Sequence, residues 1–181
     1  EAHTTLAVGS SMKSDYPVAL KHLQQCLAIA HELGDLKREA NAYSNLSNVY
    51  RNLGDLPKAL TQLQKSLSID TQLGNDEGLA GTYNNIGNVH TELHDLDEAL
   101  ENYERSAALY AKENNAKGRA QALMNLGATH LDRGDRTLAL EEFSQSLALY
   151  RGMGRTLETG MAFNNMGRAY GELGRAPEAY A

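Results

Sequence analysis

The sequence repeats itself every 40 residues, and this period restricts the possible folds more than any other feature. Alanine occupies one position of the repeat without interruption: Ala19, Ala59, Ala99, Ala139 and Ala179. All three prolines of the chain, Pro17, Pro57 and Pro177, also share one position. A period of about 20–50 residues is typical of solenoids and other arrays, whose units bury their apolar faces against their neighbours.

Each unit has the pattern of two helices joined by a tight turn. In the unit that starts at Ala40, Tyr43, Leu46 and Tyr50 recur at helical spacing. Asp55 follows as an N-cap, with Pro57 in the first turn of the second helix. The predicted helices after the first unit's turn are 36–53, 56–73, 76–93, 96–113, 116–133, 136–153 and 156–173. The chain is therefore predicted to be all-α.

The positions between helices carry residues that tolerate left-handed backbone. Glycine is the usual residue there, and His94 and Asn114 take its place in two turns. In the turn that follows His94, Asp95 and Glu98 have the spacing of a capping box. A second glycine position, Gly127 in the fourth unit, lies mid-helix, where a missing side chain lets two helix backbones approach closely.

The residues of the fourth unit resemble the tetratricopeptide repeat. Its pattern appears as Leu123, Leu126, Gly127, His130, Gly134, Asp135, Ala139 and Phe143. The 40-residue variant is similar to the arrays of kinesin light chain, of the LGN spindle-orientation adaptor and of bacterial peptide-sensing regulators. The resemblance implies a right-handed superhelical solenoid of antiparallel helix pairs.

The resemblance covers essentially the whole chain, which is expected to form one array over residues 1–181. The repeats are approximately 1–39, which is degenerate, then 40–79, 80–119, 120–159, and 160–181, which is truncated. A repeat cut at Ala181 exposes an apolar face without a cap, so we expect the chain to be a fragment of a longer protein.

Asparagine marks one face of the first helix in each pair. One position holds Asn in four successive repeats, and this set, Asn45, Asn85, Asn125 and Asn165, is called the asparagine column. Asn is a poor helix former, but its amide carries both a donor and an acceptor and can pair with a peptide backbone of any sequence. In kinesin light chain and the LGN adaptor, which this face resembles, such asparagines bind extended peptides in the concave groove. The predicted peptide-binding residues are the asparagine column with Asn41, Asn48, Asn52, Asn84, Asn88, Asn164 and Arg168.

Two other interpretations of this face remain open. The amides could bond only to each other or to neighbouring helices, as a structural ladder. A stripe of Asn52, Glu92, Asp132 and Glu172, interrupted by Arg168, could instead read basic residues of a partner. A carboxylate clamp is disfavoured because the position of Asn84 carries no lysine in any repeat.

Other function classes lack a signal in the sequence. The net charge of −6 argues against a nucleic-acid footprint, and no apolar run reaches the roughly 20 residues of a membrane span. His90 and His94 are four apart, yet no third metal ligand is evident. Cys26 shares its position with serines and is expected to be a small buried residue rather than a nucleophile. No catalytic motif is present, so we expect no enzyme activity, cofactor, metal or membrane insertion, and the simplest setting is the cytoplasm.

The sequence thus predicts a scaffold that binds an extended peptide from a partner protein. The alternative is a regulatory sensor domain that controls an output domain of a larger signalling protein. In that case the partner is an intramolecular domain.

Overall fold

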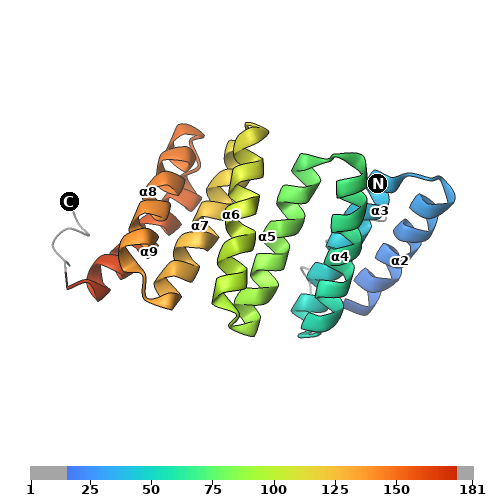
Figure 1. Ribbon diagram of the computed structural model, residues 1–181, viewed down its shortest axis with the longest axis horizontal. Coiled ribbons are helices and arrows are strands. Elements are labelled where there is room, and N and C mark those ends of the chain that lie inside the picture. Colours follow the sequence, from blue (N-terminus) through green and yellow to red (C-terminus); the bar gives the residue numbers. More distant parts are fainter. Residues whose placement is uncertain (1–15, 175–181) are drawn as a thin grey trace. The chain divides into compact units, whose positions relative to one another are not determined.

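The chain folds as a series of consecutive helices (Figure 1), and the computed structural model describes residues 16–174. Over that range it contains eight helices and no strand. The start of the degenerate first repeat lies outside the described residues, as do Pro177 and Ala179. The prediction of an all-α chain is confirmed.

The helices fall at the predicted places. For the seven predicted ranges the observed ends differ by at most one residue, as in Leu36–Asn52 against 36–53. The helices are α2 (Tyr16–Glu32), α3 (Leu36–Asn52), α4 (Leu56–Leu73), α5 (Asp76–Leu93), α6 (Leu96–Lys112), α7 (Ala116–Arg133), α8 (Arg136–Gly152) and α9 (Thr156–Glu172). We call α3, α5, α7 and α9 the first helices of their pairs, and α2, α4, α6 and α8 the second helices.

Every described turn contains a residue in the left-handed conformation. The prediction for His94 and Asn114 is confirmed, with φ of 62° and 54°. The amide of the residue after the left-handed one then reaches back to a carbonyl five positions earlier, as in Asp55 N to Tyr50 O at 2.9 Å. This is the Schellman arrangement, which satisfies carbonyls that a helix end would otherwise leave unpaired.

The helix starts are capped less uniformly than the sequence suggests. Asp55 accepts a hydrogen bond from the backbone N–H of Lys58 at 3.2 Å, as predicted. The expected capping box at Asp95 is wrong, because this side chain makes no cap hydrogen bond. Its carboxylate lies 3.3 Å from Nδ1 of His90 on the preceding helix instead.

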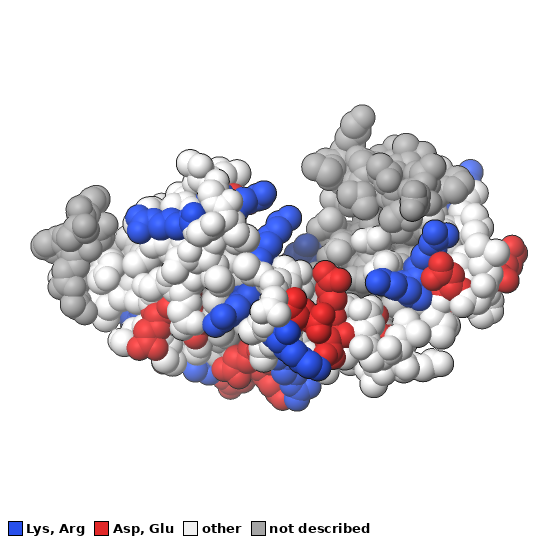
Figure 2. All heavy atoms as spheres, turned by 90° about the horizontal axis from the view of Figure 1, so that it is seen from above, with Lys and Arg blue, Asp and Glu red and all other residues white. Residues whose placement is uncertain are grey.

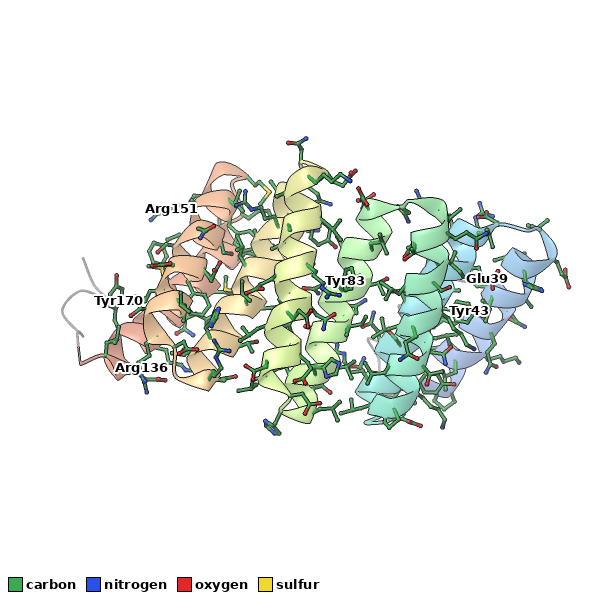
Figure 3. All side chains as sticks on the ribbon, in the orientation of Figure 1. Glu39, Tyr43, Tyr83, Arg136, Arg151 and Tyr170 are labelled. Carbon is green, nitrogen blue, oxygen red and sulfur yellow. The ribbon has the colours of Figure 1, made fainter. Side chains whose placement is uncertain are left out.

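The chain divides into two compact units, Glu1–Val89 and His90–Ala181. In the first unit, the core includes Ala59 and Leu63, both fully buried, between α4 and its neighbours. The packing face of α3 carries Tyr43, one turn from Glu39 (Figure 3), and Lys65 of α4 lies 5.1 Å from the Tyr43 ring centre. The predicted packing side of α3 is therefore confirmed.

In the second unit, the mid-helix glycine allows the close approach that the sequence indicates. A Cβ added at Gly127 of α7 would lie 2.7 Å from the ring of Phe143 on α8, too close for any side chain. Phe143 is fully buried, so a glycine on α7 faces a buried aromatic ring on α8. This contact sets how near α7 and α8 pack.

A serine links the two helices of a pair in each unit. Ser66 on α4 donates to the carbonyl of Ala40 on α3 at 3.0 Å. Ser146 on α8 donates to the carbonyl of Ala120 on α7 at 2.8 Å. Both serines are buried, whereas Cys26, at the same repeat position, is half-buried rather than fully buried as expected. The link acts on a backbone carbonyl, so it does not depend on the side chain at the partner position.

Candidate functional site

The asparagine face of the first helix is present in the structure, but it is less open than a bare groove. On α3, Asn41 and Asn52 are exposed, while Asn45 and Asn48 are half-buried. Among the other predicted site residues, Asn164 and Arg168 are exposed, and the half-buried ones are Asn84, Asn85, Asn88, Asn125 and Asn165. The asparagine column thus lies at the edge of the helix packing rather than fully in solvent.

Two amides of the asparagine column reach across to the preceding first helix. In the first unit, Asn85 on α5 donates from Nδ2 to the hydroxyl of Ser44 on α3 at 3.1 Å. In the second unit, Asn165 on α9 donates to the sulfur of Met124 on α7 at 3.2 Å. Both bonds span 41 residues, so the same repeat geometry produces them. The column therefore has a structural role in both units, as the ladder interpretation expects.

Asn125 makes a different contact. Its Oδ1 atom accepts a hydrogen bond from Gln121 Nε2, one turn earlier on α7, at 3.1 Å. Gln121 also accepts from the hydroxyl of Tyr150 on α8 at 3.3 Å. Side chains of the first-helix face are therefore tied to the second helix as well.

A polar cavity opens beside the asparagine face in the first unit. It has a volume of about 250 Å³ and lies among α3, α4 and α5. Its walls include Asn41, Ser44, Asp70, Gly78, Gly81 and Thr82. The predicted site meets this cavity at one residue, because Asn41 alone of these wall residues belongs to it.

Asp70 is the buried charge of this cavity. Its side chain is almost inaccessible, with 3% of the residue exposed. One carboxylate oxygen accepts from Asn75 Nδ2 at 2.7 Å, and the other lies 3.4 Å from the Ser66 hydroxyl and 3.5 Å from the Thr82 hydroxyl. Burial raises the pKa of Asp70 above its usual value, and the hydrogen bonds from Asn75, Ser66 and Thr82 oppose that rise.

The repeat itself marks Asp70 as unusual. The same position holds Ala30, Tyr110 and Tyr150 in the other repeats. A carboxylate in a column of apolar and aromatic residues is a signal in the sequence that could have identified this place. The asparagine pattern does not lead to it, because the asparagines lie on the first helix of each pair and Asp70 lies on the second.

The acidic stripe is already matched by arginine in the second unit. Arg168 Nη2 lies 3.0 Å from an Asp132 oxygen, and Arg136 Nε lies 3.3 Å from a Glu172 oxygen. Both pairs are exposed, so each contributes little to stability. They nevertheless reduce the negative charge that the stripe would offer to a basic partner. On the face shown in Figure 2, basic side chains are scattered among acidic and uncharged ones.

The pair His90 and His94 and the apolar character of the helices do not point to a further site within the described residues. His94 follows the end of α5 with a positive φ, and Nδ1 of His90 lies 3.3 Å from the Asp95 carboxylate. No group of three or more His, Cys, Asp or Glu that could hold a metal ion occurs within residues 16–174. Over the same residues, no helix is both long and apolar enough to cross a membrane.

The fold is shared with several solved structures. One is BtubC (BKLC) from P. vanneervenii, with 22% identity over 98% of this chain and 74% of that one, and a TM-score of 0.88. Another is a putative kinesin light chain from Podosopora anserina with nearly identical TPR-like repeats, at 19% identity over 99% and 89% of the chains and a TM-score of 0.79.

A third is a signal transduction ATPase with numerous domains from Pyrococcus horikoshii, a protein with a tetratricopeptide repeat sensor. It has 18% identity and a TM-score of 0.87, and the match covers 98% of this chain but 28% of that protein. At such identities the likeness shows the fold alone.

The sequence comparison is more specific. No sequence among curated proteins matches this chain. The model of the family described as tetratricopeptide repeat matches residues 2–72, 78–152 and 118–180, which together span most of the chain. With the helix pairs, the left-handed turns and the small residues at close contacts, this match shows that the chain belongs to the tetratricopeptide repeat family.

Proposed function

We propose that this chain is a protein-interaction module that binds an extended peptide segment of a partner along the asparagine face of its first helices. One observation supports this most directly: in both units, asparagines that bridge neighbouring first helices stand beside further asparagines of the same face. The bridging amides fix the positions of the others. An array of preset donors and acceptors suits a peptide backbone, which presents both groups at every residue.

The spacing of the helices fits such a ligand. Adjacent packed helices lie roughly 8–10 Å apart, and an extended chain rises roughly 3.3 Å per residue. One asparagine per repeat then meets the peptide backbone about every third residue. The partner's side chains between these points are left for other parts of the surface to recognise.

The hydrogen bonds of the asparagine column assign different tasks to different asparagines. Asn85 and Asn165 use their amide nitrogens within the protein, so they act first as supports. Asn164 is exposed beside Asn165 on α9, and Asn48 lies on the asparagine face of α3. We assign direct peptide contact to residues of this second kind.

A second candidate function is a sensor domain within a larger signalling protein. It is favoured by the likeness to the Pyrococcus horikoshii protein, whose tetratricopeptide repeats form a sensor and of which this fold covers 28%. Peptide binding by the same face would then be the input, and an attached domain would be the output. The two candidates share the binding step and differ in its consequence.

The test uses peptides selected from a random display library on the intact chain. Changing Asn48 and Asn164 together to Ala should weaken binding of the selected peptides by about 1–3 kcal/mol, roughly 5- to 150-fold, since each lost hydrogen bond nets about 0.5–1.5 kcal/mol. Gln64→Ala, which removes an exposed amide from the second helix α4, is the matched control. Unchanged affinity in the double variant, with the thermal midpoint also unchanged, would remove this face from the binding site.

The ladder interpretation has its own readout. Asn85→Ala removes the bond to Ser44 and should lower the thermal stability of the first unit, because a partly buried partner loses its donor. If Asn85→Ala destabilises the chain while the Asn48 and Asn164 double variant binds peptide normally, the whole face is structural.

A further inference from the structure

The cavity lies where the second repeat has Asp70 in place of the tyrosine of the later repeats, Tyr110 and Tyr150. In the third repeat, the Tyr110 ring lies against Gly118, where an added Cβ would be 2.5 Å from the ring. In the first unit, Asp70 and Gly78 occupy the same two repeat positions. The aspartate is shorter than the tyrosine, and a cavity of about 250 Å³ lies beside it.

The carboxylate in this cavity has no cation within hydrogen-bond contact among the described residues. The charge of Lys37, which also lines the cavity, acts on it from farther away and opposes the rise of its pKa that burial causes. All its hydrogen-bond donors, Asn75, Ser66 and Thr82, are neutral, and no ion pair of Asp70 is found among the described residues. Burying a charge without an opposite charge is costly, so such groups are normally paired. Asp70 is thus a buried carboxylate without a salt bridge, and it lies at the wall of a space large enough to admit another group.

The charges around the opening favour a cation. Lys37 of α3 and Glu77 of α5 are both exposed and line the cavity with Asp70. Two acidic groups against one basic group leave this space negative. Asn41 and Ser44 add neutral oxygens that can accept hydrogen bonds from an ammonium or guanidinium group.

We propose that this cavity is a specificity pocket for a basic side chain, arginine or lysine, of the bound peptide, with the Asp70 carboxylate as its counter-ion. This inference rests on the proposed function, because the cavity opens beside the same asparagine face. The asparagines hold the peptide backbone regardless of sequence, and Asp70 selects one residue of it. Lys37 competes with the ligand for Asp70 rather than assisting it.

The first experiment needs no known partner. Isotope-labelled full chain is titrated with acetylated arginine and lysine amides, with guanidinium and methylammonium ions, and with the neutral citrulline amide. The amide signals of Gly78, Gly81, Thr82 and the Asn75 side chain should shift with the arginine and lysine amides and stay in place with citrulline. Equal shifts with the charged and neutral amides would overturn the proposal. Stronger binding of the free ions than of the amides would point to a free small cation as ligand and would likewise overturn it.

Two substitutions then separate binding from folding. Asp70→Asn keeps the shape and removes the charge, and it should weaken the arginine amide and any selected basic peptide by roughly tenfold or more. Asp70→Tyr restores the residue of the later repeats and should abolish the response by filling the space. Neither should lower the thermal midpoint, which distinguishes a ligand pocket from a structural carboxylate. Glu141→Gln, an exposed acid on α8, is the control for loss of charge, and Lys37→Ala should leave binding intact or strengthen it.

The selected peptides distinguish this inference from the proposed function. If Asp70→Asn binds them as the unchanged chain does, while the Asn48 and Asn164 double variant does not, the asparagine face is the binding site and the pocket proposal is wrong. If both variants bind normally, both proposals fail.

Discussion

The place beside Asp70 in the first unit and the place beside Tyr150 in the second are built from the same repeat positions but are filled differently. Tyr150 is buried, with 3% exposed, and its hydroxyl bonds to Gln121 on the first helix of its pair. Asp70 is equally buried, but beside it lies a cavity. Ser66 and Ser146 make the same link to a backbone carbonyl in both places. The residue at one position of the second helix, Asp70 or Tyr150, therefore determines whether the space between the helices of a pair is open or filled. The serine–carbonyl bond between those helices is the same in both cases.

The largest loss of stability is expected when the Tyr150 side chain, which fills its space, is removed. Tyr150→Ala should destabilise the second unit by about 3–5 kcal/mol, as buried aromatic residues usually do when truncated. Denaturant unfolding monitored for each unit separately would measure this. A loss below about 1 kcal/mol would mean that the ring does not support the packing.

Overpacking the equivalent position of the third repeat, where the Tyr110 ring lies against Gly118, should destabilise the chain less. Gly118→Ala puts a Cβ against the Tyr110 ring and should destabilise the second unit by about 1–3 kcal/mol. The matched change Gly78→Ala puts a Cβ into the Asn75 and Asp70 side chains, so it should disturb the pocket. Thermal melts of both variants compare the two places directly, and a gain of stability at Gly118 would contradict the tight contact.

Filling the cavity beside Asp70 should stabilise the first unit. Asp70→Tyr fills the cavity and removes a buried charge, which should add about 0.5–2 kcal/mol to the stability of the first unit. The same denaturant experiment measures it. A clear loss of stability would show that the space differs from the one beside Gly118.

The surface charges of the second unit should matter little. Arg168→Ala breaks exposed ion pairs to Asp132 and Glu172, and it should cost at most about 1 kcal/mol. Melting at low and high salt tests this, because such pairs weaken as salt screens them. If Arg168→Ala lowers the stability by the same amount at low and at high salt, the arginine has a packing role instead.

The smallest effect expected is a dependence on pH from Asp70. Its pKa is raised in the fold above the usual 3.8, so the folded chain holds this proton more tightly than the unfolded chain. The contribution of Asp70 to stability therefore declines as the pH rises from its unfolded pKa through its folded pKa. Lys37 on α3 and Glu77 on α5 face the same space and modulate this effect. Stability curves of the unchanged chain and Asp70→Asn should converge at low pH, and parallel curves would contradict the prediction.

The helix ends and turns could be predicted from the sequence because each depends on residues that are close in sequence and the same pattern recurs in every repeat. His94 and Asn114 show this well: neither is glycine, yet their repeat position alone predicts the positive φ that both adopt. The capping box at Asp95 failed because a neighbouring side chain, His90, competes for the carboxylate. A pattern in sequence does not reveal which of two nearby donors an acceptor will choose.

The site was less accessible to prediction. The asparagine column was visible in the sequence, but the bond from Asn85 to Ser44 joins residues 41 apart and depends on how closely two helices pack. The cavity at Asp70 depends on a volume left empty, and a sequence contains no direct record of empty volume. Both features depend on distances between helices, which no local pattern in the sequence gives.

The serine link between the helices of a pair also affects how such a chain can change. Because Ser66 and Ser146 bond to the backbone of their partner helix, these two links do not depend on which side chain the partner helix carries at that point. Mutation can therefore alter one recognition position without re-engineering the assembly. For a protein designer, the pairs that carry this link are the natural place to change a recognition position first.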